Sequence, residues 1–331
     1  MKILLGFALS IALSSAQAQE KFTVQLRWMP QAQFIGYYVA KEKGYYKDVG
    51  LDVVIRPGGP ETGPVKALSG GEADIGVEWL ASALAARERG TPMVNVAQVF
   101  NRSGLMLTCL NARGIARPSD LRGKRIGVWF GGLEYPFLSW MNKLGIKTSG
   151  PAADLAVVPQ GFDVAPLIKG EVDCISTMIY NEFWKTIEAG INPLDLVSFQ
   201  YEDQGVAMLE DGLYVLEPRL TDLKFVDRTR RFVNASLKGW QYALANRDEA
   251  VQILVKGAGL RPEQSGFQLL QLKSIAKLIN NSASTSSFGR LDHDAYRRTV
   301  NVLLKSGGEK VITRDPGSAG YTEIVWSGGV K

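Results

Sequence analysis

The sequence is poor in the residue types from which catalytic and metal sites are built. Its 331 residues include one histidine, His293, and two cysteines, Cys109 and Cys174. One imidazole and two distant thiols argue against a structural zinc site, and they leave no Ser-His-Asp or Cys-His constellation to assemble. The glycine-rich stretch RPGGPETGPV (56–65) lacks the spacing and the lysine of a phosphate-binding loop. We therefore expect a non-enzyme with no catalytic residue, no metal and no cofactor.

Charge of one sign is not concentrated anywhere. Lys and Arg total 38 and Asp and Glu total 33, and the two signs are mixed along the chain without a basic run. The formal net charge of +5 is therefore spread out. A spread charge does not support a nucleic-acid partner, and we expect none.

Long apolar runs are missing beyond the start of the chain. The chain opens with the positive Lys2, a short apolar run over 3–13 and the small-x-small pattern Ala16-Gln17-Ala18. This is typical of a secretory signal peptide (1–18) cleaved after Ala18; a buried N-terminal helix is the alternative. The run is too short to span a bilayer, and no cysteine follows it to carry a lipid. We expect a soluble, exported protein located in the periplasm.

Both cysteines lie in apolar, strand-like runs, LMLTCL (105–110) and VDCISTMIY (172–180). An exported protein could join Cys109 and Cys174 in a disulfide. Two buried free thiols are the alternative that we favour, because a free cysteine behaves as a small apolar core residue.

Strand and helix patterns alternate along the first two thirds of the chain. The first series predicts strands at 21–28, 51–57, 73–77 and 94–100. Helical patterns lie between them, within 61–69, over 81–90 and over 32–46, where Gly44 ends the first helix. Such alternation predicts βαβ units and a parallel sheet. The series then restarts, and APLIKGEVDCIST (165–177) repeats the pattern of VKALSGGEADIGV (65–77). This internal repeat, and a length above that of a single core, predict two similar lobes.

The last third of the chain differs from the rest. Residues 221–259 predict two consecutive helices, and polar helical stretches follow to about Leu304. The segment DGLYVLEP (211–218) is expected to be a strand that returns to the first lobe. The polar tract NNSASTSS (280–287) is expected to be an exposed loop.

The residues around the first helix resemble those of a known family. The pattern is similar to that of bacterial substrate-binding proteins for thiamine-precursor pyrimidines, whose wider family includes binders of riboflavin, sulfonates and nitrate-type solutes and the fungal thiamine-pyrimidine synthases. The segments GGEADIGV (70–77) and DLRGKRIGV (120–128) share this resemblance. The residues that carry it in the first segment are Trp28, Pro30, Gly36, Tyr38, Ala40, Lys43, Gly44, Tyr45, Tyr46, Gly50, Leu51, Asp52 and Val53.

The resemblance implies an α/β, type II periplasmic binding protein fold, in which two doubly wound lobes are joined by two crossover strands. We expect lobe 1 to comprise 19–108 plus 214–331 and lobe 2 to comprise 109–213, with the crossovers near 106–110 and 213–216. In open parallel sheets, ligands bind at the carboxyl ends of strands, and helices begin at such ends after Trp28, Val77 and Trp129.

The function implied is that of the periplasmic solute-binding component of an ABC importer, which captures a thiamine-precursor pyrimidine by closing its lobes. The alternative is the same role for riboflavin or another flat heterocycle. The partners expected are the heterocyclic ligand and a membrane permease, and the protein is expected to be a monomer.

A pyrimidine synthase is a remote alternative. Those enzymes carry a lysine and, four residues later, a histidine in the segment that matches DIGVEWLAS (74–82), and a cysteine-rich cluster later. Here the two positions are Glu78 and Ser82, and the chain has no cysteine cluster. A histidine that the enzymes and many pyrimidine binders share is replaced by Phe34, which favours a larger or less polar ring.

Aromatic and polar residues that follow strands form the candidate site. Trp28 and Phe34 are expected to flank a flat ring by stacking; a core role is the alternative. Glu78 could accept hydrogen bonds from a ring amine or imide, or favour a helix start. Gly131 and Gly132 permit close backbone approach to a ligand. The complete ligand-binding set is Trp28, Gln33, Phe34, Tyr37, Glu78, Trp79, Trp129, Gly131, Gly132, Glu134, Tyr135, Tyr180, Asn181, Glu182 and, as a hinge candidate, Asp211.

Overall fold

Two five-stranded sheets organise the protein, whose computed structural model describes residues 18–279, 288–305 and 311–326. The expected signal peptide and the tract 280–287 therefore lie outside the described residues, apart from Ala18. The first sheet has the order β2-β1-β3-β10-β4. Its strands are β1 (Glu20–Gln25), β2 (Leu51–Arg56), β3 (Ile75–Glu78), β4 (Met93–Gln98) and β10 (Gly212–Leu216).

The second sheet repeats this topology with the order β7-β6-β8-β5-β9. Its strands are β5 (Leu105–Leu110), β6 (Arg125–Val128), β7 (Ala156–Pro159), β8 (Cys174–Met178) and β9 (Leu196–Gln200). In each sheet four strands run in the same direction, and the fourth in order, β10 or β5, runs antiparallel to both of its neighbours. The two lobes and their internal repeat are thus confirmed.

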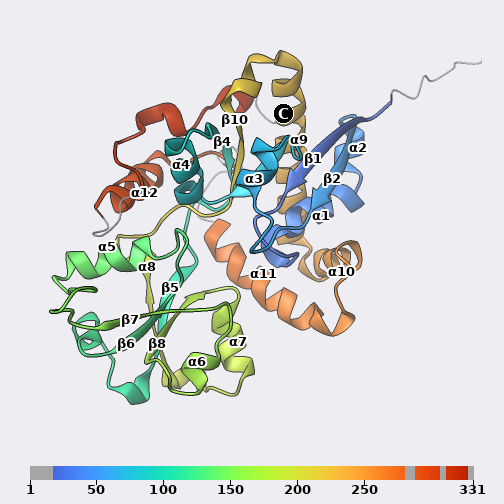
Figure 1. Cartoon of the computed structure of the whole chain (residues 1–331). Coiled ribbons are helices and arrows are strands. Elements are labelled where there is room, and N and C mark those ends of the chain that lie inside the picture. Colours follow the sequence, from blue (N-terminus) through green and yellow to red (C-terminus); the bar gives the residue numbers. More distant parts are fainter. Residues whose placement is uncertain (1–17, 280–287, 306–310, 327–331) are drawn as a thin grey trace, which may run out of the picture.

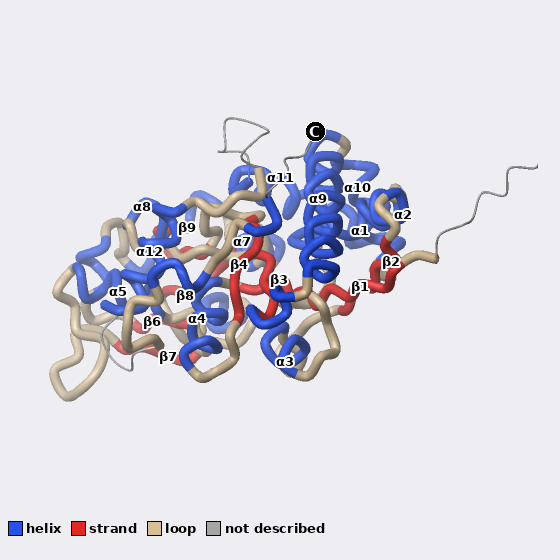
Figure 2. Tube along the Cα trace, turned by 90° about the horizontal axis from the view of Figure 1, so that it is seen from above, coloured by secondary structure: helices blue, strands red, loops and turns tan. Residues whose placement is uncertain are grey.

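Helices cover the sheets of both lobes (Figure 1). Lobe 1 carries α1 (Ile35–Glu42), α2 (Tyr45–Asp48), α3 (Pro64–Ser69), α4 (Leu80–Glu88), α9 (Leu223–Ala245) and α10 (Arg247–Gly257). Lobe 2 carries α5 (Tyr135–Lys143), α6 (Ala165–Ile168), α7 (Glu182–Glu188) and α8 (Tyr201–Gln204). Two late helices, α11 (Ser265–Ile279) and α12 (His293–Lys305), lie where the lobes meet. Seen from above, α9 and α1 lie at one end of the molecule and α5 at the other (Figure 2).

The packing of α1 on α9 explains why glycine stands at position 36, one of the residues that carry the family resemblance. A side chain at Gly36 would overlap the indole ring of Trp240, and one at Gly239 would overlap the backbone carbonyl of Gly36. Only glycine therefore lets the two helices approach this closely. Gly44, with φ of 79°, ends this helical segment as predicted, and α2 starts directly after it.

The chain crosses between the lobes twice, over 99–104 and over 205–211. The crossing segments are hydrogen-bonded to each other: the amides of Val99 and Phe100 donate to the carbonyl oxygen of Asp211 at 3.2 and 3.3 Å. Glu210 adds a second link, because its Oε1 accepts from the amide of Gly104 at 2.7 Å. The two crossings are therefore adjacent, hydrogen-bonded segments rather than two independent linkers.

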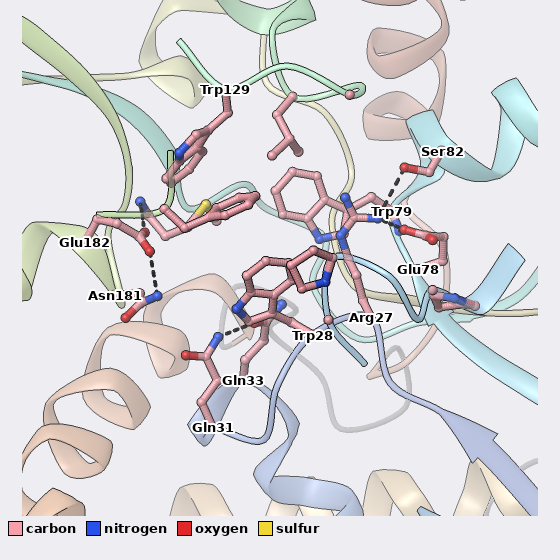
Figure 3. A pocket seen from close by; sticks show the side chains of 18 of the residues that line it. Arg27, Trp28, Gln31, Gln33, Glu78, Trp79, Ser82, Trp129, Asn181 and Glu182 are labelled. Atoms are coloured by element: carbon pink, nitrogen blue, oxygen red, sulfur yellow. Dashed lines mark hydrogen bonds and ion pairs between the residues drawn. The ribbon is translucent and has the colours of Figure 1, made fainter. Parts of the chain in front are cut away.

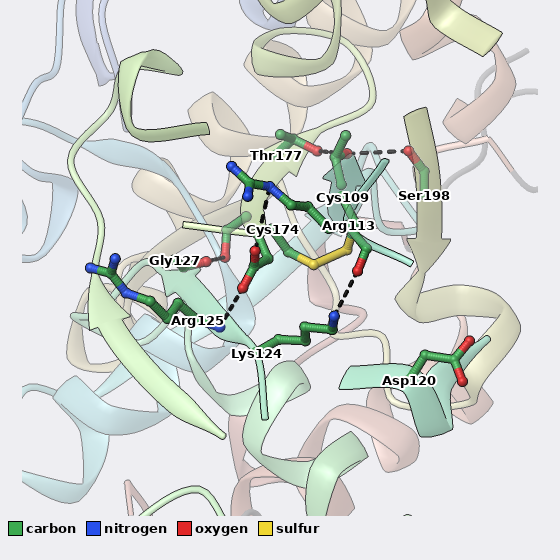
Figure 4. The surroundings of a disulfide bond; sticks show 12 residues. Cys109, Arg113, Asp120, Lys124, Arg125, Gly127, Cys174, Thr177 and Ser198 are labelled. Atoms are coloured by element: carbon green, nitrogen blue, oxygen red, sulfur yellow. Dashed lines mark hydrogen bonds and ion pairs between the residues drawn. A yellow bond between two sulfur atoms is a disulfide. The ribbon is translucent and has the colours of Figure 1, made fainter. Parts of the chain in front are cut away.

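The two cysteines are bonded to each other (Figure 4). Cys109 on β5 lies directly opposite Cys174 on β8 in the antiparallel register, and both side chains are completely buried. The preference for two free thiols is therefore wrong. The two runs looked like independent core strands, and only their pairing across 65 residues brings the sulfur atoms together.

The described residues contain no helix that is both long and apolar enough to cross a membrane.

Candidate functional site

A cavity of about 390 Å³ lies between the lobes, at the carboxyl ends of their parallel strands. Lobe 1 contributes residues that follow β1, β2 and β3, and lobe 2 contributes residues that follow β6, β7 and β8. The lining residues are Arg27, Trp28, Gln31, Gln33, Gly59, Pro60, Gly63, Pro64, Val65, Glu78, Trp79, Ser82, Trp129, Phe130, Gly131, Leu133, Phe162, Met178, Tyr180, Asn181 and Glu182. This placement agrees with the general rule for ligand sites in open α/β sheets.

Three aromatic rings bridge the lobes at the cavity. The ring of Phe162, which follows β7, lies 4.7 Å from that of Trp28 in lobe 1 and 6.0 Å from that of Trp129, both measured between centroids. The Trp129 indole is held in place because its Nε1 donates to the carbonyl oxygen of Gly161 at 2.8 Å. The rings are tilted rather than parallel, at 56° and 35°. They form an apolar wall suited to a flat ligand.

Arg27 is the one cationic side chain among the described lining residues, and it is already engaged. Its guanidinium forms an ion pair with Glu78 and donates to Ser82 Oγ at 3.2 Å. The same group lies 4.5 Å from the ring centroid of Trp79, in a cation–π contact. Burial lowers the pKa of Arg27, and the charge of Asp211 opposes that shift. Figure 3 shows this cluster on one side of the cavity, with Trp129, Asn181 and Glu182 on the other.

Asp211 lies just behind the lining residues of lobe 1. Its Oδ1 accepts from the indole Nε1 of Trp79 at 2.8 Å, and both of its oxygens accept from Gln33 Nε2, at 3.0 and 2.8 Å. Burial raises the pKa of Asp211 to about 6, and these donated hydrogen bonds oppose the rise. Asp211 therefore fixes two lining side chains from the second crossover.

Amide side chains continue this hydrogen-bond network beside the cavity. Gln31 Nε2 donates to Gln33 Oε1 at 2.7 Å, and Gln31 Oε1 accepts from Gln271 Nε2 at 3.1 Å. In lobe 2, Asn181 Nδ2 donates to Glu182 Oε1 at 2.6 Å. Burial raises the pKa of Glu182. The cavity therefore offers a ligand carboxylate oxygens and side-chain amides as hydrogen-bonding groups, and one guanidinium, that of Arg27, whose charge is neutralised by Glu78.

The structure places nine of the sequence-predicted residues at the cavity and six elsewhere. Those at the cavity are Trp28, Gln33, Glu78, Trp79, Trp129, Gly131, Tyr180, Asn181 and Glu182. Those that do not line it are Phe34, Tyr37, Gly132, Glu134, Tyr135 and Asp211.

The six exceptions have separate physical reasons. Phe34 is completely buried in a 3₁₀ turn of the core, so it cannot stack on a ligand beside Trp28. Tyr37 stacks on Phe232 within lobe 1. The side chain of Glu134 accepts from the amide of Gly132 at 2.8 Å and so shapes its own loop. Tyr135 begins α5 and packs partly buried against the core. Asp211 acts behind the lining residues, as described above.

The sequence prediction missed Arg27, Gln31, Ser82 and Phe162. The strand predicted over 21–28 includes Arg27, whereas β1 ends at Gln25. Phe162 follows β7, so the rule that placed Trp129 after β6 could have found it. The described residues contain no group of three or more His, Cys, Asp or Glu side chains that could hold a metal.

Comparison with known proteins identifies the family. The profile described as "NMT1/THI5 like" matches residues 31–250, so the chain belongs to this family. It is 25% identical to the formylaminopyrimidine-binding protein of Halalkalibacterium halodurans, over 88% of this chain and 86% of that one. It is 27% identical to the riboflavin-binding protein RibY of Chloroflexus aurantiacus, over 87% and 81%. It is 30% identical to a 4-amino-5-hydroxymethyl-2-methylpyrimidine phosphate synthase (THI13) of Saccharomyces cerevisiae, over 69% and 68%.

Solved structures show the same fold. A periplasmic sulfonate-binding protein of Methylobacillus flagellatus superposes with a TM-score of 0.65 at 13% identity, over 94% of each chain. The periplasmic aliphatic sulphonate binding protein of Escherichia coli superposes with a TM-score of 0.60 at 16% identity, over 77% of this chain and 79% of that one. The expected family and the periplasmic binding protein fold are thus confirmed, and together they support a ligand-binding role.

Proposed function

We propose that the protein is the periplasmic solute-binding component of an ABC importer, and that it captures an uncharged pyrimidine precursor of thiamine. The observation that carries this proposal is the cavity between the lobes, where aromatic rings of both lobes lie beside carboxylate and amide acceptors. A formylaminopyrimidine-binding relative, matched over 86% of its own chain, supports it. Residues 1–18 then direct export, and mature protein isolated from the periplasm should begin at Gln19.

The charges of the cavity disfavour an anionic solute. Arg27 is paired with Glu78, and the remaining ionisable side chains of the lining, such as Glu182, are acidic or phenolic. A sulfonate would therefore meet no free cation, and its desolvation would not be compensated. An aminopyrimidine offers ring-edge N–H donors to these acceptors. The volume of about 390 Å³ lies near the lower end of the usual range of about 300–1,000 Å³ for ligand pockets, which suits a small ring.

Riboflavin is the second candidate. A relative named as a riboflavin-binding protein and the aromatic wall of Trp28, Phe162 and Trp129 favour a larger flat ring. A synthase is not favoured, because Glu78 and Ser82 occupy the positions of the enzymes' lysine and histidine. Both side chains hold Arg27 instead.

Calorimetric titration and thermal shift with three probes test the proposal: a formylaminopyrimidine, riboflavin and an alkanesulfonate. The pyrimidine at 100 times its Kd should stabilise the fold by about 2.7 kcal/mol. Trp28→Ala should weaken its binding by roughly tenfold or more, and the ring-retaining Trp28→Phe should weaken it less. Tight binding of the alkanesulfonate alone, or turnover of a bound probe, would overturn the proposal.

A further inference from the structure

Helix α11 is attached to both lobes, although it lies beyond the residues that match the family profile. On the lobe 1 side, Gln268 Oε1 accepts from the amide of Ala32 at 2.7 Å. On the lobe 2 side, Ser274 Oγ accepts from the indole Nε1 of Trp184 at 2.9 Å. The hydrogen-bonding face of this helix is buried: Gln268, Gln271 and Ser274 are 3%, 0% and 4% exposed.

Gln271 alone, among the described residues of α11, joins polar side chains of the two cavity walls. Its Nε2 donates to Gln31 Oε1 of lobe 1 at 3.1 Å and to Asn181 Oδ1 of lobe 2 at 3.2 Å. Its Oε1 accepts from the amide of Ala32 at 3.2 Å. One carboxamide thus holds a lining residue from each side of the cavity.

We propose that Gln271 is a positioning residue for ligand binding, which latches the lobes together and orients Gln31 and Asn181 toward a bound ligand. The proposal rests on the proposed function for the identity of that ligand, but the latch itself does not depend on it. When the lobes part, Gln271 must lose its bond to either Gln31 or Asn181. A buried amide then loses a partner until water replaces it, so closure is favoured.

The latch is also connected to the hinge. From Gln31 the side-chain hydrogen bonds continue through Gln33 to Asp211, which lies in the second crossover. A shift of lobe 2 relative to α11 is therefore transmitted to the crossover through side chains that also line the cavity. This arrangement gives Gln271 an effect on closure that a helix-stabilising residue would not have.

The first test needs no ligand. Spin labels at Lys66→Cys on α3 and Lys169→Cys after α6 report the distance between the lobes, and both positions are exposed. The two natural cysteines are bonded to each other and should not react. Gln271→Met should broaden the distance distribution toward longer values. Gln268→Met is the matched control, because the hydrogen bond described for the Gln268 side chain is to lobe 1; its distribution should match the parent.

The second test uses a formylaminopyrimidine or riboflavin and stopped-flow tryptophan fluorescence. Gln271→Met should raise the dissociation rate about tenfold and leave the association rate within twofold, because a latch acts on the closed complex. Gln268→Met should change neither rate beyond twofold. Trp184→Phe keeps an aromatic ring but removes the hydrogen bond to Ser274. It should therefore lengthen the distance between the lobes and raise the dissociation rate, as Gln271→Met should. This variant replaces Gln271→Met if the latter does not fold.

The outcomes separate the two proposals. If Gln271→Met and the parent show the same distances between the lobes, or if Gln268→Met changes both readouts as much as Gln271→Met, the latch is wrong. If neither probe binds the parent protein, the proposed function fails, while the distance measurement still decides the role of Gln271.

Discussion

Glu210 lies where the two crossover segments meet. Its Oε1 accepts from Ser103 Oγ at 2.6 Å and from the amides of Gly104 and Leu105 at 2.7 and 3.1 Å. Its Oε2 is buried and has no hydrogen-bond partner among the described residues. Burial raises the pKa of Glu210 to about 8, and the hydrogen bonds oppose that rise. Burial of this carboxyl group, with one oxygen left without a donor, favours its neutral form.

This arrangement predicts that the protein becomes less stable as the pH rises from 5 to 8. The folded-state pKa of Glu210 lies above the ordinary 4.5, so the folded protein binds more protons than the unfolded chain in this window. The free energy of unfolding should fall by at most about 1.4 kcal/mol per pH unit for this one group. Asp211, with a pKa of about 6, adds to the effect in the lower part of the window.

Urea unfolding at a series of pH values measures the slope. Glu210→Gln is the matched variant, because it keeps an accepting oxygen for Ser103, Gly104 and Leu105 but cannot titrate. Its slope between pH 5 and 8 should be shallower than that of the parent. Equal slopes in the two proteins would show that Glu210 is ionised in the folded state.

The Arg27–Glu78 pair gives a second prediction at the scale of single residues. The Glu78 side chain is 4% exposed and that of Arg27 is 19% exposed, so Glu78→Gln leaves the largely buried guanidinium of Arg27 without its carboxylate partner. We expect a loss of about 3 kcal/mol in the free energy of unfolding. Adding Arg27→Met should restore most of that loss, since a buried ion pair can be replaced by apolar groups of similar volume.

The control for this prediction is an exposed ion pair. Glu42 and Lys256 lie on the surface with side chains 53% and 80% exposed, and Glu42→Gln should cost less than about 1 kcal/mol. Unfolding curves of the four proteins decide the comparison. Similar losses in the free energy of unfolding for Glu78→Gln and Glu42→Gln would contradict the prediction that breaking the buried Arg27–Glu78 pair is costly.

At the scale of elements, the disulfide ties β5 to β8 in the middle of the second sheet. The residues it joins are 65 apart in the sequence, and the chain-entropy estimate for a loop of that length is about 4 kcal/mol. The double variant Cys109→Ala/Cys174→Ala should therefore lose roughly that amount in urea unfolding. Adding a reductant should have little further effect on the variant. A loss below about 1 kcal/mol would mean that the packing of β5 and β8 alone holds the sheet.

Local patterns were sufficient to predict most elements but not their ends. The helix ended by Gly44, the helix–turn–strand repeat and the two long helices that became α9 and α10 all depend on short-range periodicity and turn residues. The strand predicted over 21–28 is too long because β1 ends where its pairing with β2 ends, at Gln25 and Arg56. Beyond that point Arg27 and Trp28 turn into the cavity, which no local pattern indicates.

The site was predictable only where it follows strand ends. Trp79 and Trp129 come directly after β3 and β6, and Asn181 comes three residues after β8, so the strand-end rule found all three. Gln31 and Gln271 are 240 residues apart, and only the meeting of η1 (Ala32–Phe34) with α11 brings them together. The disulfide was missed for the same reason, because its pairing is a property of the sheet.

At the scale of the whole molecule, four segments of the described part of the chain connect the lobes. Two are the crossovers, and the third is α11. The fourth is α12, which packs between α4 of lobe 1 and α5 of lobe 2 (Figure 1). Thr299 of α12 accepts from the amide of Leu209 in the second crossover at 2.9 Å, and Asn142 of α5 donates to the carbonyl oxygen of Lys305 at 3.2 Å. If the lobes open, these links favour a hinge motion over free separation.

Closure of such a hinge around a ligand should protect backbone amides of both lobes at once. With saturating formylaminopyrimidine or riboflavin, deuterium exchange should slow in peptides covering 27–34 of lobe 1 and 129–134 and 178–183 of lobe 2, because water leaves both walls together. Peptides covering 45–56, which lie on the outer side of lobe 1, should exchange at an unchanged rate and serve as the internal control. Protection confined to lobe 1 would mean that the ligand binds one open wall, and closure would then play no part in binding.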